Sequence, residues 1–248
     1  MPDVTGYRAK VGIIIPSTNT VVEADFNNEL RIPGVTFHAG RMYIPAPALD
    51  SDDAFRSLLV QVDSAFEVAL RDVLTCQPDH ISMAMSAPTF WGGAAGNEGF
   101  LAKAAGLTSL DVTTGAESCR RALEAFGARR IAVITPYQPV MREQIVRYFE
   151  DVGFTVPAYR DLRCESATAI AQVQPGPLAD AVREMDGDGI DAIVQAGTNL
   201  SMVRLADELE HELGKPVIAI NTAIAWGTYR TLGFDDVIDG VGRLLREH

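Results

Sequence analysis

Four short loops carry the side chains best able to hold or activate a small anion. They are residues 16–20, 86–97, 135–137 and 196–199, and each follows a short run of mainly apolar residues. Hydroxyl, amide and phenol side chains recur in these loops, and backbone N–H groups at a helix start also bind anions. The combination favours binding of, and proton transfer to, a small acid.

The first two loops can hold an anion from one side. Ser17 and Asn19 precede an expected helix, where they can cap the helix or donate hydrogen bonds to a ligand. Ser86 and Ala87 follow an apolar run, and their backbone N–H groups can form an oxyanion cradle. A plain helix cap or a simple turn is the alternative for each residue taken singly.

Aromatic and glycine residues continue the second loop. Phe90 and Trp91 can line the cradle with apolar surface. Gly92, Gly93 and Gly96 follow, but they do not form the strand, GxGxxG and distal acid of a dinucleotide site. The loop therefore favours a small ligand over a nicotinamide cofactor.

The last two loops would complete the site from the other side. Tyr137 can donate a proton there, although an ordinary half-buried aromatic residue is the alternative. Thr198 and Asn199 stand in the second-half equivalent of the loop that begins at Ser86. Tyr137, Ser86 and Thr198 are the side chains that we expect to supply a proton, directly or through water.

Short apolar runs alternate with longer helical stretches, and this pattern predicts an α/β fold with parallel strands and helices on both faces of each sheet. Buried strands are expected at residues 11–15, 81–85, 131–135, 192–195 and 217–220, and edge strands at 35–43 and 155–162. Ligands of such sheets bind outside the carboxyl ends of the strands. The four loops lie at those ends.

The two halves of the chain resemble each other. Segments 10–19 and 130–139, 78–85 and 190–196, and 112–114 and 220–222 match in order, with offsets of 120, 112 and 108. Chance similarity of αβ units is the alternative to duplication. We predict two pseudo-symmetric domains, 1–115 plus 222–248 and 116–221, with the active-site cleft between them. A helix near Gly115 would link the halves, and one from Ala223 to the chain end would pack back on the first.

Composition excludes several classes of function. A net charge of −12 repels nucleic acid, and no basic cluster compensates for it. No run approaches the about 18 apolar residues that cross a membrane, and the first ten residues lack the apolar core of a signal peptide. We therefore expect a cytoplasmic protein with no nucleic-acid or membrane partner.

The cysteines and histidines do not form a metal or disulfide pattern. Three widely spaced cysteines fit neither a disulfide framework nor a zinc site, and the four histidines are scattered. Residues 186–191 have the aspartate spacing of a calcium loop but lack its distal glutamate. We expect no metal.

The loops together resemble a known group of enzymes. The PSTN sequence at 16–19, the Thr-Pro-Tyr at 135–137 and the closing segment from Gly240 resemble maleate cis-trans isomerases, and residues 90–97 resemble a loop of arylmalonate decarboxylases. Both belong to the aspartate/glutamate racemase superfamily. The resemblance spans nearly the whole chain and implies two pseudo-symmetric αβ domains, no cofactor, a small carboxylic-acid substrate and one catalytic cysteine from each half.

The sequence departs from that pattern at both thiols. The resemblance places Met85 at the first cysteine position and Gly197 at the second, and none of the three cysteines aligns with either. Asn19 and Tyr137 match carboxylate-contacting residues of the isomerases, whereas Thr168 replaces an asparagine. The binding residues therefore match better than the catalytic ones.

Three functions stay open at this stage. The first is a cofactor-independent decarboxylase or lyase that acts on a small mono- or dicarboxylic acid without a thiol, because decarboxylation needs one proton donor where racemisation needs an acid and a base. The second is an isomerase or racemase that uses a misaligned cysteine, and the third is a non-catalytic carboxylate-binding relative. The resemblance also implies a homo-oligomer.

Overall fold

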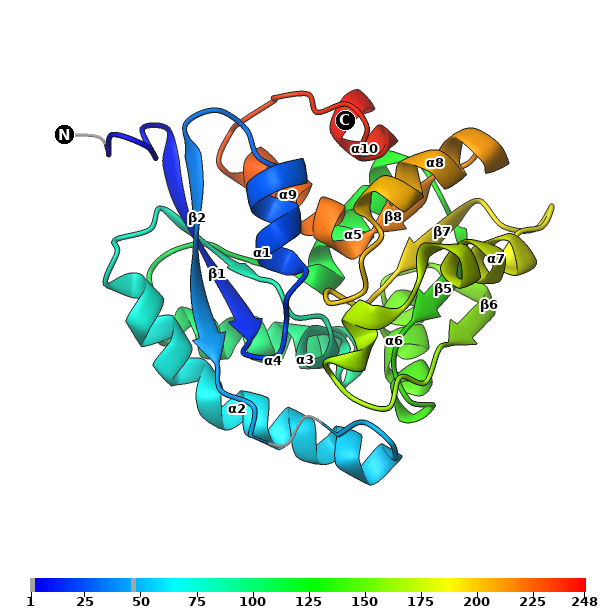
Figure 1. Cartoon of the computed structure of the whole chain (residues 1–248), viewed down its shortest axis with the longest axis horizontal. Helices are drawn as coiled ribbons and strands as arrows, with labels where there is room; N and C mark the ends of the chain where they lie inside the picture. Colours follow the sequence, from blue (N-terminus) through cyan, green and yellow to red (C-terminus); the bar gives the residue numbers. More distant parts are fainter. Residues whose placement is uncertain (1–2, 46–47) are drawn as a thin grey trace.

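Two parallel four-stranded sheets form the centres of the two halves, and the computed structural model describes them within residues 3–45 and 48–248 (Figure 1). The first sheet runs β2 (Val35–Met42), β1 (Ala9–Pro16), β3 (His80–Met83) and β4 (Val112–Thr114). The second runs β6 (Thr155–Asp161), β5 (Arg130–Thr135), β7 (Ala192–Gln195) and β8 (Val217–Ala219). Every neighbouring pair is parallel. The two strand orders are equivalent, so the predicted pseudo-symmetric α/β fold is confirmed.

Helices separate the strands along the chain. The first half contains α1 (Val22–Ala24), the π-helix η1 (Asp25–Glu29), α2 (Asp52–Leu74), α3 (Ala87–Phe90), α4 (Gly93–Ala105) and α5 (Gly115–Ala125). The remainder contains α6 (Val140–Asp151), the 3-10 helix η2 (Ala169–Gln172), α7 (Pro175–Met185), α8 (Val203–Leu213), α9 (Ile220–Thr231) and α10 (Arg243–Glu247). In the described part of the chain, none of these helices has the length and apolar character needed to cross a membrane.

Burial explains why the strands could be recognised. Central strands β1, β3, β5 and β7 are almost completely buried, as the continuous apolar runs predict, while the edge strands β2 and β6 are half exposed. The strand predicted at 81–85 ends earlier, at Met83, because the chain turns toward α3 after a last hydrogen bond from the N–H of Ala84 to the Ile14 carbonyl. Met85 therefore lies beyond the sheet.

The helix expected from Ala223 to the chain end is interrupted, and this prediction was wrong. Helix α9 already starts at Ile220 and stops at Thr231, and Gly233 follows with a φ of +76°, a left-handed conformation that ends helices. A non-helical segment then leads to the short α10. The position of α9 agrees with the prediction that it packs back: Thr228 bonds Ser82 of β3 at 2.7 Å, and α9 also packs against α5.

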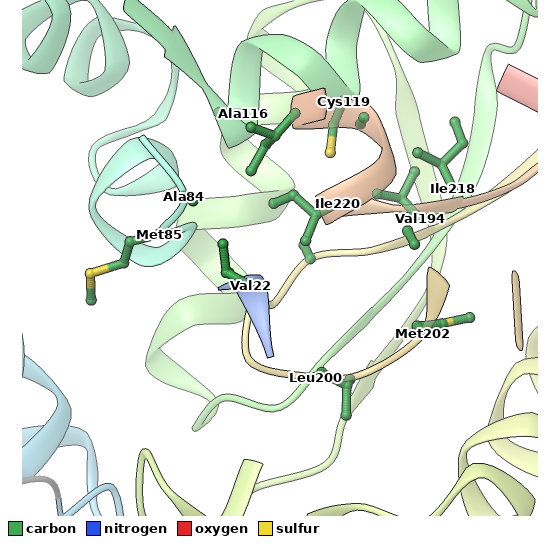
Figure 2. Close-up of a cluster of buried hydrophobic side chains, with 14 of the residues drawn as sticks. Val22, Ala84, Met85, Ala116, Cys119, Val194, Leu200, Met202, Ile218 and Ile220 are labelled. Carbon is green, nitrogen blue, oxygen red and sulfur yellow. The ribbon is translucent and has the colours of Figure 1, made fainter. Parts of the chain in front are cut away.

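An apolar cluster joins the halves behind the strand ends (Figure 2). Its labelled members come from strands β7 and β8 of the second sheet, from the segment after β3 of the first, and from helices and a loop around them: Val22, Ala84, Met85, Ala116, Cys119, Val194, Leu200, Met202, Ile218 and Ile220. Every one of these side chains is buried. The loops at the strand ends therefore stand on a packed base.

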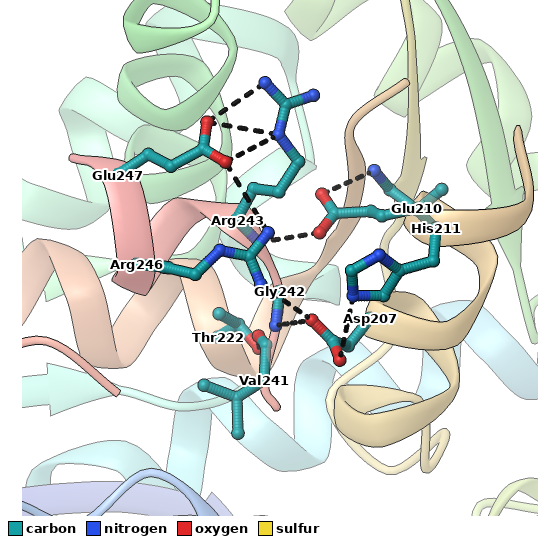
Figure 3. A network of polar contacts seen from close by, with 10 residues as sticks. Asp207, Glu210, His211, Thr222, Val241, Gly242, Arg243, Arg246 and Glu247 are labelled. Atoms are coloured by element: carbon teal, nitrogen blue, oxygen red, sulfur yellow. Dashed lines mark hydrogen bonds and ion pairs between the residues drawn. The ribbon is translucent and has the colours of Figure 1, made fainter. Parts of the chain in front are cut away.

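A polar network ties the end of the chain to α8 (Figure 3). The buried carboxylate of Glu210 accepts hydrogen bonds from the N–H of Val217 at 3.0 Å and of Arg243 at 2.6 Å. Asp207 accepts from the N–H of Gly242 at 3.2 Å and lies 3.5 Å from Arg246. These contacts hold α10 in place together with the buried side chains of Leu244 and Leu245.

A candidate carboxylate site between the two halves

A small cavity of about 30 Å³ lies between the two sheets, at the carboxyl ends of their strands. Its lining residues come from both halves: Pro16, Thr18, Asn19, Leu49, Leu58, Met85, Ala87, Tyr137, Ala167, Ile170, Thr198 and Asn199. The volume is about that of one water molecule. Six of the predicted site residues, namely Asn19, Met85, Ala87, Tyr137, Thr198 and Asn199, line this one cavity.

Hydrogen bonds cross the cavity from one half to the other. The hydroxyls of Ser86 and Tyr137 form a close contact, and the Asn19 side-chain amide lies 3.4 Å from the Thr198 hydroxyl. The side-chain oxygen of Asn199 accepts from the N–H of Thr20 at 3.0 Å. The loops at 16–20, 86–97, 135–137 and 196–199 are thus brought together as the sequence predicted.

The backbone N–H groups of four buried residues at or beside this cavity have no acceptor among the described residues. Ala87 of the first half and Thr198 and Asn199 of the second line the cavity, and Ser86 lies between the lining residues Met85 and Ala87. Unpaired buried N–H groups are rare in proteins and have a free-energy cost unless a ligand or water accepts from them. Their pairing across the cleft fits the two oxygens of a carboxylate.

Among the residues that the structure describes, no Lys, Arg or His side chain lines the cavity. An anion bound there would be held by neutral donors, as in an oxyanion hole, and not by an ion pair. Burial raises the pKa of Tyr137 to about 12, with the hydrogen bond from Ser86 acting in the opposite direction. Tyr137 is therefore a protonated phenol at neutral pH and can donate to an oxyanion or a carbanion.

The remaining predicted binding residues lie around the cavity without lining it. The Ser17 hydroxyl accepts from the N–H of Ile44 at 3.0 Å, and Thr168 is exposed and lies 3.1 Å from the Ser166 hydroxyl. The Gly197 carbonyl accepts from the Gln195 side chain. Ser17 and Gly197 thus fix the shape of their loops.

The two aromatic residues of the second loop point in other directions. Phe90 is fully buried and packs edge-on against Tyr148 of α6, with ring centroids 5.1 Å apart. Trp91 lines a separate surface depression together with Phe66 and Phe100. Because α3 is a single turn, Ala87 faces the cavity while Phe90 faces the core. Leu49, Leu58 and Ile170 supply the apolar wall in their place.

The covering segments come from both halves as well. Ala48 and Ser166 form an antiparallel bridge, and the N–H of Leu49 donates to Glu165 at 2.8 Å. Asn199 donates its side-chain N–H to the Ala167 carbonyl at 2.8 Å. These contacts join the two halves beside the cavity.

None of the three cysteines lines the cavity. Cys76 follows the C-terminal end of α2, at the opposite end of the sheet, and Cys119 is fully buried in α5 with its pKa raised far above the ordinary value by burial. Cys164 is half-buried in the covering segment, where it lies near enough to influence Tyr137, and burial raises its thiol pKa. In this conformation, none of the three cysteines can place a thiolate in the cavity.

Three polar residues behind the cavity were missed by the sequence reasoning. Gln195, Asn221 and Asp25 are buried. Gln195 and Asn221 donate hydrogen bonds to carbonyls of the 196–199 loop, and Asp25 accepts one from Asn221. Gln195 and Asn221 follow apolar strand residues at the ends of β7 and β8, and such a polar side chain in an apolar run is the signal that could have revealed them.

Comparisons with known proteins agree with this geometry. A family model described as arylmalonate decarboxylase matches residues 11–245. The maleate isomerase of Nocardia farcinica is 28% identical over 247 residues, covering 96% of both chains, and the arylmalonate decarboxylase of Bordetella bronchiseptica is 26% identical with the same coverage. A solved Cys-to-Ser variant of the Nocardia farcinica maleate cis-trans isomerase, carrying a covalently bound succinylcysteine intermediate, superposes with a TM-score of 0.87 at 27% identity over 96% of this chain and 98% of that one.

Proposed function

Because the chain belongs to the arylmalonate decarboxylase family, we propose that it is a cofactor-independent decarboxylase or related lyase that acts on a small carboxylic acid without a cysteine nucleophile. The observation that supports this most is the combination of four unpaired N–H groups and a protonated Tyr137 at a cavity that no cysteine lines. The family match covers residues 11–245, and the reaction is the part that we propose.

The reaction that we propose for a malonate-type acid has two steps. One carboxylate leaves as CO2 when its carbon–carbon bond breaks, and the electron pair stays on the α-carbon and spreads into the remaining carboxylate as an enediolate. The N–H groups of Ser86, Ala87, Thr198 and Asn199 stabilise the negative charge that develops on its oxygens. One proton then adds to the α-carbon, which gives the product acid.

The departing carboxylate would lie against the apolar wall. The side chains of Leu49, Leu58 and Ile170 offer no hydrogen bonds there. A charged carboxylate is therefore destabilised against this wall, whereas neutral CO2 needs no hydrogen bonds and is not destabilised. Tyr137 and Ser86 stand at the polar end and are the proposed source of the proton, with Thr198 as the third hydroxyl. A phenol with a pKa of about 12 is acidic enough to protonate an enediolate carbon.

Release of CO2 from malonate and from methyl- and phenyl-substituted malonates tests the proposal, and the variants are Tyr137→Phe, Ser86→Ala and Thr198→Val. We expect at least one of them to lower kcat by a factor of about 100 or more. Tyr159→Phe is the matched control, because its hydroxyl bonds Thr135 at 3.2 Å outside the cavity lining. Losses below tenfold in all three site variants would exclude these proton donors.

A maleate isomerase is the second candidate, favoured by the similarity to maleate isomerases of four organisms. This chemistry requires a thiol to add to the double bond, and Cys164 is the cysteine whose N–H donates to the carbonyl of Pro136, next to Tyr137, at 2.9 Å. Replacing Cys76, Cys119 and Cys164 by serine distinguishes the two reactions. Unchanged turnover of the triple variant would exclude the isomerase mechanism, and calorimetric binding of malonate or maleate without any turnover would favour a carboxylate-binding protein over both enzymes.

A further inference from the structure

We propose that Gln195 and Asn221 are positioning residues that aim two N–H donors of the carboxylate site, and that Asp25 holds Asn221 in the required orientation. The inference rests on the proposed function, because it assigns a purpose to the N–H groups of Thr198 and Asn199. It concerns residues behind the cavity, none of which touches a bound acid in the proposed mode.

Two successive peptide units carry these donors. The Gly197 carbonyl accepts from the side-chain amide of Gln195 at 2.6 Å and also from the N–H of Leu200 at 2.9 Å. The Thr198 carbonyl accepts from the side-chain amide of Asn221 at 3.0 Å. All described peptide bonds are trans, so each carbonyl points opposite to the N–H of the next residue. Fixing the carbonyls of Gly197 and Thr198 therefore fixes the N–H directions of Thr198 and Asn199.

Both carbonyls point away from the cavity. Gln195 and Asn221 are not among the lining residues, whereas Thr198 and Asn199 are. The N–H groups on the other side of these peptides are consequently directed toward the cavity side, where no acceptor from residues 3–45 or 48–248 meets them. The two amides act on the site only through the backbone.

The contacts that hold Asn221 in place lower the stability of the fold. Its Nδ2 donates both hydrogens, one to Thr198 and one to the Asp25 carboxylate at 2.7 Å, while its buried Oδ1 has no partner. Asp25 is 7% exposed and has no ion-pair partner among the described residues. An unpaired buried carboxylate and an unpaired buried amide oxygen both reduce stability. A role in the site accounts for their presence.

The orientation of Asn221 follows from its neighbours. An amide rotated by half a turn would place Oδ1 against the Thr198 carbonyl and the Asp25 carboxylate, which are both acceptors. Asp25 itself starts the π-helix η1, a wide turn that is common at functional sites. Gln195 is fixed in a similar way, since its Oε1 accepts from the N–H of Ile220 at 3.3 Å. Both amides thus connect the loop to the start of α9.

Crystal structures and malonate calorimetry of two variants, Asn221→Leu and Gln195→Leu, test the proposal. Each removes an amide while keeping a similar volume. We expect the peptide that loses its amide to rotate, further in Asn221→Leu than in Gln195→Leu because Leu200 still donates to the Gly197 carbonyl. Malonate should bind about tenfold or more weakly. Thr228→Val is the control, since it removes a buried hydrogen bond of α9 to Ser82 far from the loop. Thr228→Val should lose about as much thermal stability as the leucine variants, but change the Kd for malonate by no more than about twofold.

Two variants of Asp25 test whether this residue holds Asn221 in the required orientation. Asp25→Ala should weaken malonate binding as Asn221→Leu does, and Asp25→Asn, which keeps an acceptor for Asn221, should restore most of the affinity. Unrotated peptides in both leucine variants, or an equal loss in Thr228→Val, would overturn the proposal. If the unmodified protein binds no malonate, the proposed substrate class fails, and the peptide orientations in the crystals still decide the positioning roles.

Discussion

The carboxylate of Asp25 is expected to destabilise the protein at neutral pH. Burial raises its pKa to about 6 from an ordinary 3.8, the Asn221 hydrogen bond acts against this, and the charge of Glu29 adds to it. The folded state therefore binds a proton more readily than the unfolded state between these two values. The destabilisation is complete above pH 6 and disappears as the pH falls toward 3.8.

The magnitude follows from the two pKa values. The difference between about 6 and 3.8 corresponds to roughly 3 kcal/mol of unfolding free energy. Asp25→Asn removes the charge and retains a weaker hydrogen bond to Asn221, so we expect a net gain of about 1–3 kcal/mol at pH 8. For a chain of this length the midpoint of thermal unfolding should rise by roughly 2–4 °C per kcal/mol. At pH 4 the two proteins should be nearly equal.

Urea denaturation of both proteins at pH 8, 6 and 4 measures this difference. Asp188→Asn is the control, because Asp188 is exposed in the turn after α7 and should change stability by no more than about 0.5 kcal/mol. The charges near Asp25 are those of Glu29, which pairs with Arg204, and of Glu208. A variant that is less stable than the unmodified protein at every pH would show that the carboxylate is well compensated.

Three further changes have defined outcomes. Met85→Ala should lower stability by about 2–4 kcal/mol in urea denaturation and let bulkier substituted malonates bind in calorimetry, because Met85 is 5% exposed and lines the cavity. Gly197→Cys should cost about 1–3 kcal/mol, since its Cβ would lie 2.4 Å from Pro136; a fully stable variant would contradict this. Glu210→Ala leaves the N–H of Arg243 unpaired, so limited proteolysis should cleave the chain end faster at equal temperature.

The fold could be predicted because its signals are local. Each buried strand of a parallel sheet is a short apolar run, and the equivalent order of the two sheets appears in the sequence as matching segments. The loops of the cavity could be predicted for the same reason, since the carboxyl ends of parallel strands are the binding edge. The domain boundaries at 115, 116, 221 and 222 stay a prediction.

The residues behind the cavity could not be predicted in this way. Asp25 reads as one of several acidic residues after the first loop, and only the packing of α9 against η1 brings it to Asn221. The directions of Phe90 and Trp91 also depend on where the single turn of α3 starts. A sequence shows which residues follow a strand, whereas the side to which each one points is decided by tertiary packing.

The contact between Ser86 and Tyr137 joins the two halves. Under the proposed function, an acid that binds at Tyr137 would compete with Ser86 for the phenol. A neutral ester or amide of the same shape would exchange one uncharged acceptor for another and gain little, while a carboxylate would form the stronger, charge-assisted hydrogen bond. The Ser86–Tyr137 contact would then favour an acid over its uncharged analogue at the binding step, before any bond of the substrate changes.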